Sequence, residues 1–87
     1  MRVTFAVPAQ LAKRSICIAG SFNDWDTESH PLRLDEKRGV WQRAISFKPG
    51  TEVQFRYFVD GHAWHNEAEA DAWVPTPFFS DNSVLAL

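Results

Sequence analysis

Apolar and polar residues alternate along most of this chain with a period of two. The pattern is clearest where Val53, Phe55, Tyr57 and Val59 alternate with other residues, among them Arg56. Successive side chains of a strand point to opposite faces of a sheet, so this pattern is typical of a strand with one buried face. We therefore expect a strand here, with Arg56 on its outward face.

The same alternation predicts further strands at residues 2–7, 15–20 and 39–47, the last interrupted by Arg43, and a short apolar run predicts a strand at 83–87. Turn residues separate these segments, and Asp60-Gly61 predicts a hairpin whose returning strand is residues 62–65. Arg38-Gly39 marks a second hairpin, after the segment at 31–34. Several short strands joined by turns, without an amphipathic helix, predict an antiparallel sandwich or a small barrel.

Residues 66–82 do not follow the strand pattern. The part from 67 to 72 is rich in alanine and acidic residues and is compatible with a helical turn, whereas Pro75 and Pro77 exclude a helix and a central strand. We predict a long ordered connection without regular structure, anchored by apolar side chains such as Trp73.

The length and the net charge of the chain limit the kinds of function that it can have. The chain has 87 residues, which leaves room for one domain at 1–87, and 45% of its residues are hydrophobic. A formal net charge of −2 offers no electrostatic footprint for nucleic acid or for an anionic membrane. No apolar run is long enough to cross a bilayer, and the first residues lack a signal-peptide pattern. We expect an intracellular, cytoplasmic protein with neither nucleic acid nor membrane as partner.

Catalytic and metal chemistry finds little support in the residues. Cys17 is the single cysteine, which excludes an internal disulfide, and His62 and His65 lack a third metal ligand at a convincing spacing. The acidic side chains at 24–28 lie on one turn, whereas glycosidases hold two carboxylates across a cleft. We expect no catalytic residue, no metal and no cofactor, and a small hydrolase is the least supported alternative.

Four tryptophans are an unusual number for so short a chain. Trp41 lies on the apolar face of its expected strand and is predicted to belong to the core. Trp25 lies in a polar turn and Trp64 follows the expected hairpin, so we predict that both rings are exposed or face a ligand.

Four sequence blocks carry a resemblance to a known family. They are GSFNDW at 20–25, KPG at 48–50, FRYFVDG at 55–61 and DNSVL at 81–85. Their order and spacing resemble the carbohydrate-binding module of family 48, which includes the glycogen-binding domain of the AMP-activated protein kinase β subunit and the isoamylase N-terminal early-set domain. The resemblance implies an all-β, immunoglobulin-like early-set (E-set) antiparallel β-sandwich. It also implies non-catalytic binding of α-1,4-linked glucan, as in glycogen, starch or a maltooligosaccharide.

The resemblance also assigns the sugar-binding positions. The two tryptophans that stack on glucose rings fall on Trp25 and Trp64, and the residues that hydrogen-bond the hydroxyls fall on Arg56 and Asn82. Two further contact positions map to Phe78 and Ser80. Trp64 stands one residue later after the turn than in the family, and one step along a strand turns a side chain to the other face. A bulge or a longer turn would restore the face.

The chemistry of these residue types fits a neutral sugar chain. A flat indole covers the C–H face of a glucose ring, and by analogy with base–aromatic stacking one contact contributes about 1–3 kcal/mol. Arg56 and Asn82 supply planar donors and an acceptor for the hydroxyl rim. The alternative is a spacer or protein-interaction early-set domain that has lost carbohydrate binding, since sheet edges can accept a partner strand. The displaced Trp64 and one extra residue before Asn82, relative to the family, support that alternative.

Overall fold

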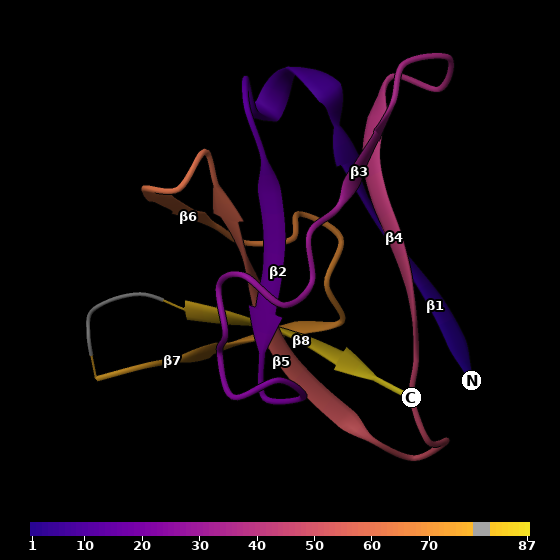
Figure 1. The fold of residues 1–87 in the computed structure, drawn as a ribbon. Helices are drawn as coiled ribbons and strands as arrows, with labels where there is room; N and C mark the ends of the chain where they lie inside the picture. Colours follow the sequence, from indigo (N-terminus) through magenta and orange to yellow (C-terminus); the bar gives the residue numbers. More distant parts are fainter. Residues whose placement is uncertain (78–80) are drawn as a thin grey trace.

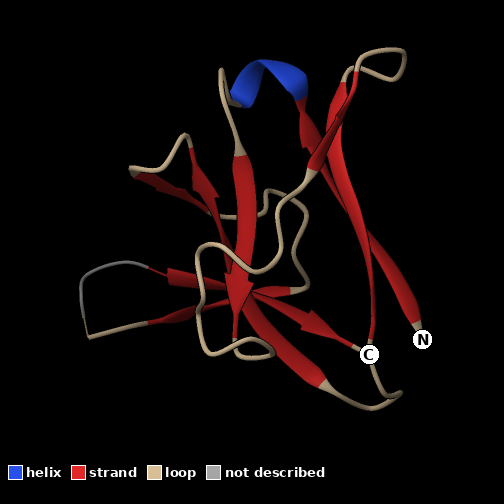
Figure 2. Cartoon of the chain, in the orientation of Figure 1, coloured by secondary structure: helices blue, strands red, loops and turns tan. Residues whose placement is uncertain are grey.

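The computed structural model describes residues 1–77 and 81–87, which form two antiparallel β-sheets (Figure 1). The three-stranded sheet has the order β1 (Arg2–Pro8), β4 (Val40–Ser46), β3 (Arg33–Asp35). The larger sheet has the order β2 (Ile16–Gly20), β5 (Glu52–Val59), β8 (Asp81–Ala86), β7 (Ala72–Pro75), with β6 (Ala63–His65) paired to β5 on the edge opposite β2. Strands dominate the described chain, and a short 3-10 helix, η1 (Ala9–Leu11), follows β1 (Figure 2). This is the all-β early-set type of sandwich that the sequence predicts.

The core forms where the apolar faces of the two sheets meet. All four apolar residues of the β5 alternation are at most 3% exposed, as the period of two predicts. Phe5 of β1 packs edge-on against Phe55 of β5, with ring centroids 5.1 Å apart, and so joins one sheet to the other. Edge-to-face packing of this kind suits the charge distribution of aromatic rings.

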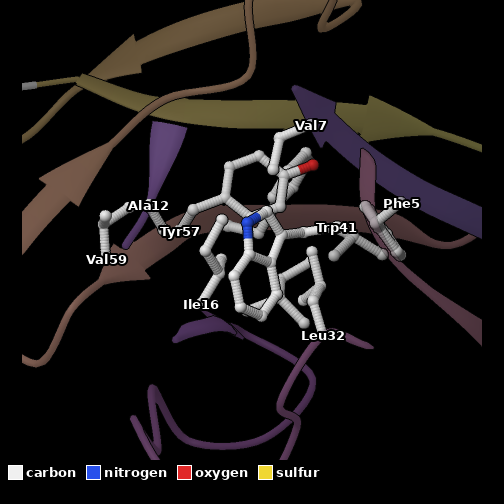
Figure 3. Close-up of a cluster of buried hydrophobic side chains, with 11 residues drawn as sticks. Phe5, Val7, Ala12, Ile16, Leu32, Trp41, Tyr57 and Val59 are labelled. Atoms are coloured by element: carbon white, nitrogen blue, oxygen red, sulfur yellow. The ribbon is translucent and has the colours of Figure 1, made fainter. Parts of the chain in front are cut away.

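Trp41 is buried in this core, as predicted from its place on an apolar strand face. Figure 3 shows its indole among Tyr57, Ile16 and Leu32. Its Nε1 donates a hydrogen bond to the Ala9 carbonyl oxygen at 3.1 Å. The indole thus fills the core with its ring and also fixes η1, a helix that the sequence pattern did not predict.

The predicted hairpins are present. β3 and β4 pair through a turn that includes Gly39, and β5 and β6 pair through a turn at Asp60 and Gly61. Gly39 and Gly61 both have positive φ, the conformation that glycine adopts without steric conflict.

The prediction for residues 66–82 is wrong in part. Ala72–Pro75 forms strand β7, which pairs with β8 at the edge of the larger sheet. An edge strand tolerates Pro75 because one side of such a strand has no ladder to complete. The helical turn with which the composition of 67–72 is compatible does not form, because the chain there has a hydrogen-bonded turn and a bend before β7 begins.

Trp73 is not a buried anchor, since 47% of its surface is exposed. Its register partner Ser83 lies opposite Phe55, so all three side chains share the inner face of the sheet. The buried core cluster contains no residue of β7, which explains why an inward-facing indole remains half exposed. The ring is held by a hydrogen bond from Nε1 to the Glu67 carbonyl oxygen.

Within 1–77 and 81–87, no helix has the length and the apolar character that crossing a bilayer requires.

Candidate functional site

The outer face of β5 presents the polar residues of the site. Because the apolar residues of this strand point into the core, Gln54, Arg56 and Phe58 point away from it. Both Gln54 and Arg56 are half-buried, since neighbouring loops cover part of this face. The alternation of the sequence therefore predicted the side of the sheet on which Arg56 lies.

The β5–β6 hairpin brings Trp64 to the same face. Trp64 lies opposite Phe58 in the antiparallel register, and the two ring centroids are 4.7 Å apart. Three residues lie between the paired Val59 and Ala63, so the additional residue is contained in the turn. Trp64 consequently keeps an outward orientation, with 43% of its surface exposed.

Trp25 comes to this face on the loop that follows β2. Its backbone N–H donates to the Gly20 carbonyl oxygen at 2.9 Å, and its φ of 59° lies in the left-handed region. A Cβ at Gly20 would overlap the Gln54 carbonyl oxygen, so only glycine lets the loop approach β5 this closely. Ser21 completes the junction, because its N–H donates to the Gln54 carbonyl oxygen and its Oγ accepts from the Gln54 N–H.

Asn23 orders the interior of the same loop. Its Oδ1 accepts from the Gly20 N–H at 2.9 Å, and its Nδ2 lies within hydrogen-bonding distance of the Ile18 carbonyl oxygen and of His30 Nδ1. Burial, with a further contribution from the Arg43 charge, lowers the pKa of His30, which favours a neutral ring that accepts at Nδ1. The loop that carries Trp25 is thus held by side-chain hydrogen bonds that the sequence motif did not reveal.

Arg56 and Asn82 form a direct pair. Arg56 Nε donates to Asn82 Oδ1 at 2.7 Å, and Asn82 Nδ2 donates to Gln54 Oε1 at 3.2 Å. The two strands that carry this network, β5 and β8, are adjacent in the sheet.

These side chains line one open depression of about 750 Å³. Its lining residues are Ser21, Trp25, Gln54, Arg56, Trp64, Thr76, Pro77 and Asn82. Four of the six positions expected from the sequence thus lie together, although they come from four separate segments. The other two, Phe78 and Ser80, lie outside the described residues.

Sequence reasoning did not identify Ser21, Gln54, Thr76 or Pro77 as members of this set. Gln54 carried one usable signal, because it lies on the same outward face of the alternating strand as Arg56. Ser21 stands inside the GSFNDW block, which gives no separate signal for this residue.

The depression combines flat aromatic surfaces with hydrogen-bonding groups. Arg56 supplies the one charge among its described lining residues, and the carboxylates of the chain lie elsewhere. Indole faces that remain open to solvent can stack on the C–H face of a sugar, while amide and guanidinium groups bind hydroxyls.

A larger depression, of about 1160 Å³, lies on the three-stranded sheet. Charged residues such as Arg2, Arg33 and Glu36 line it, and none of its lining residues is aromatic. This depression is an open sheet face flanked by long side chains. We therefore take the smaller depression as the candidate site, because its lining combines aromatic and hydrogen-bonding side chains.

The remaining candidates stay separate from the depression. Asp26 Oδ1 accepts from the Glu28 N–H, a contact that shapes the turn. Burial raises the pKa of the Cys17 thiol, with a smaller contribution from Glu28, which disfavours the reactive thiolate. Among the described residues no group of three or more His, Cys, Asp and Glu side chains is arranged to hold a metal ion.

Comparison with known proteins gives a family. The model described as "Glycogen recognition site of AMP-activated protein kinase" matches residues 9–73, a segment that contains Trp25, Arg56 and Trp64 but ends before Asn82.

Similar curated proteins are much longer than this chain. The 1,4-alpha-glucan branching enzyme GlgB of Paraburkholderia xenovorans (strain LB400) is 40% identical over 62 residues, which cover 69% of this chain and 8% of that enzyme. The enzyme of the same name from Ralstonia nicotianae is 38% identical over 65 residues, covering 69% and 8%. GlgB 1 from Xanthomonas campestris pv. campestris (strain 8004) is 37% identical over 68 residues, covering 77% and 9%. The chain thus spans less than a tenth of the length of these relatives. Because the matched family segment is most of the chain, this protein belongs to the glycogen-recognition family of carbohydrate-binding modules, of the family-48 type.

Proposed function

We propose that this chain is a non-catalytic module that binds α-1,4-linked glucan by stacking glucose rings on Trp25 and Trp64. The observation that supports it most is the shared depression, in which both indoles lie with Arg56 and Asn82. Two indoles on one surface contact more than one ring of a chain, so they favour an oligosaccharide over a monosaccharide.

The relatives support the choice of glucan. They are named as 1,4-alpha-glucan branching enzymes, which act on this type of polymer. A neutral ligand also suits a site whose described lining contains one cation and no carboxylate. The depression is open, so it covers only part of each sugar and the affinity is expected to be weak.

Titration with maltoheptaose tests the proposal. Trp25→Ala and Trp64→Ala are each expected to weaken binding by roughly 5- to 150-fold, the range that one aromatic stacking contact supplies. Binding is measured by isothermal calorimetry and by tryptophan fluorescence, and circular dichroism confirms that each variant is folded.

Trp73→Ala is the matched control, because this indole is about as exposed as Trp64 (47% against 43%), and more exposed than the half-buried Trp25, but does not line the depression. It is expected to leave maltoheptaose binding unchanged. If the wild-type protein shows no response to millimolar maltoheptaose, or if all three variants behave alike, the proposal is rejected.

Protein interaction is the second candidate, and the exposed Trp73 on β7 favours it. This indole lies at the opposite face of the sheet from Arg56, since it shares its face with the core residue Phe55. A protein retained from amylase-treated lysate by the wild-type chain and lost with Trp73→Ala would support this candidate. Retention that disappears with amylase would instead favour glucan.

A further inference from the structure

Gln54 links the parts of the depression that come from different segments. Its backbone N–H and carbonyl group are both hydrogen-bonded to Ser21, on the loop that carries Trp25. Its side-chain Oε1 accepts a hydrogen bond from Asn82 Nδ2 at 3.2 Å. The residue therefore contacts both the tryptophan loop and the Arg56–Asn82 pair.

The donor and acceptor roles in this network follow from Arg56. A guanidinium Nε–H can only donate, so the Asn82 atom at 2.7 Å from it must be the carbonyl oxygen Oδ1. The Asn82 amino group then points to Gln54, which must offer its own carbonyl oxygen. This order leaves the Gln54 Nε2 amino group as a donor, and no partner for it exists within residues 1–77 and 81–87.

We propose that Gln54 has two roles in this site, as the residue that fixes the orientation of the Asn82 carboxamide and as a donor to the sugar. Its Oε1 holds Asn82 with Oδ1 toward Arg56, and its Nε2 donates to a hydroxyl oxygen of the bound glucan. The inference rests on the proposed glucan binding. It adds that Gln54 recognises a hydroxyl oxygen as an acceptor through Nε2, while its Oε1 accepts from Asn82.

Two substitutions separate the roles. Gln54→Glu keeps an oxygen that accepts from Asn82 but replaces the donor amino group with a second oxygen. Gln54→Met has a similar length and removes both functions. Gln42→Met is the matched control, because Gln42 is a half-buried strand glutamine that hydrogen-bonds Asp35 on the other sheet.

The first measurement is maltoheptaose affinity by calorimetry. Both Gln54 variants are expected to bind roughly 2- to 12-fold more weakly, the range for loss of one hydrogen bond, and Gln42→Met is expected to bind as the wild type. Unchanged affinity of Gln54→Glu overturns the donor role. Unchanged affinity of Gln54→Met overturns both roles in binding.

The second measurement needs no ligand. In a proton–nitrogen NMR spectrum, the side-chain amide protons of Asn82 are expected to keep slow solvent exchange in Gln54→Glu, whose carboxylate still accepts from Nδ2, and to shift and exchange faster in Gln54→Met. Unshifted Asn82 signals in Gln54→Met overturn the positioning role. A wild-type protein that fails to bind maltoheptaose overturns the glucan assignment and the donor role with it, while the Asn82 signals still decide the positioning role.

Discussion

Asp60 shows how one side chain joins two distant parts of this chain. Its carboxylate accepts hydrogen bonds from the N–H groups of Lys13, Arg14 and Ser15, the shortest at 2.7 Å. Its own N–H donates to the Ser15 carbonyl oxygen at 2.7 Å. The sequence identifies Asp60 as a turn residue, because aspartate before glycine favours a hairpin, but the second role depends on a segment 45 or more positions away.

The hydrogen bonds to Lys13, Arg14 and Ser15 lower the pKa of Asp60 below its ordinary value of 3.8. A lowered pKa in the folded state means that the unfolded chain binds this proton more readily. The stabilisation by Asp60 is therefore fully present above the ordinary pKa and is lost as the pH falls through the lowered folded value.

Asp60→Asn is accordingly expected to be less stable than the wild type at neutral pH, with a difference that shrinks as the pH falls below 3.8. Asparagine tolerates the φ of 53° at this position, so the substitution removes the charge without adding backbone strain. Urea unfolding midpoints across the acid range measure the effect, with the exposed carboxylate of Glu36 replaced in Glu36→Gln as the control. A difference between Asp60→Asn and the wild type that does not depend on pH would contradict this assignment.

At the scale of elements, the β5–β6 hairpin decides whether Trp64 takes part in the site. Asp60 and Gly61 both have positive φ, and the His62 N–H closes the turn onto the Val59 carbonyl oxygen at 3.1 Å. Primed turns of this kind match the twist of the strands that they connect. Trp64 therefore lies on the outer face of the sheet, opposite Phe58, although it stands one residue later after the turn than in the family.

Deletion of His62 is expected to leave the fold and maltoheptaose binding unchanged. The shortened loop would be a two-residue Asp-Gly turn, which keeps Val59 opposite Ala63 and Phe58 opposite Trp64. Calorimetry with maltoheptaose measures the outcome.

Gly61→Val serves as the contrast, because a β-branched residue is strained at a φ of 75° and should weaken both stability and binding. Loss of binding by a folded deletion variant would show that the turn length, and not the strand register, orients Trp64.

For the whole molecule, the four tryptophans divide into three environments. Trp41 is 8% exposed and lies between the sheets, where its ring supports the shared core. Trp25 and Trp64 line the depression on the outer face of the larger sheet. Trp73 lies on β7, beyond the edge of the core.

Trp41→Ala is expected to lower the free energy of unfolding by about 3–5 kcal/mol, the range for removing a large aromatic side chain from a core. A chain of this size has a small total stability, so the variant should be largely unfolded at room temperature. Trp73→Ala should change the free energy of unfolding by less than about 1 kcal/mol, because the ring is half exposed. Urea denaturation followed by circular dichroism compares the two, and equal losses would mean that Trp73 also supports the core.

The sequence predicted the strands and turns that are specified by residues close together in the chain. The alternation at 53–59 determined β5 and the outward direction of Arg56, and the Asp60-Gly61 pair determined the hairpin. It failed at β7, because Pro75 argues against a strand unless the edge position is known.

The sequence by itself determined the class of fold and the buried face of β5, which follow from a local period and from turn residues. The four residues that meet in the depression were assigned through the resemblance of ordered short motifs to a known family. The tertiary structure alone decided the exposure of Trp73, the hydrogen bonds from the backbone of residues 13–15 to the Asp60 carboxylate, and the hydrogen bond from Asn82 to Gln54. These depend on which distant segments are brought into contact, and no local pattern specifies the distance or direction between side chains of separate strands.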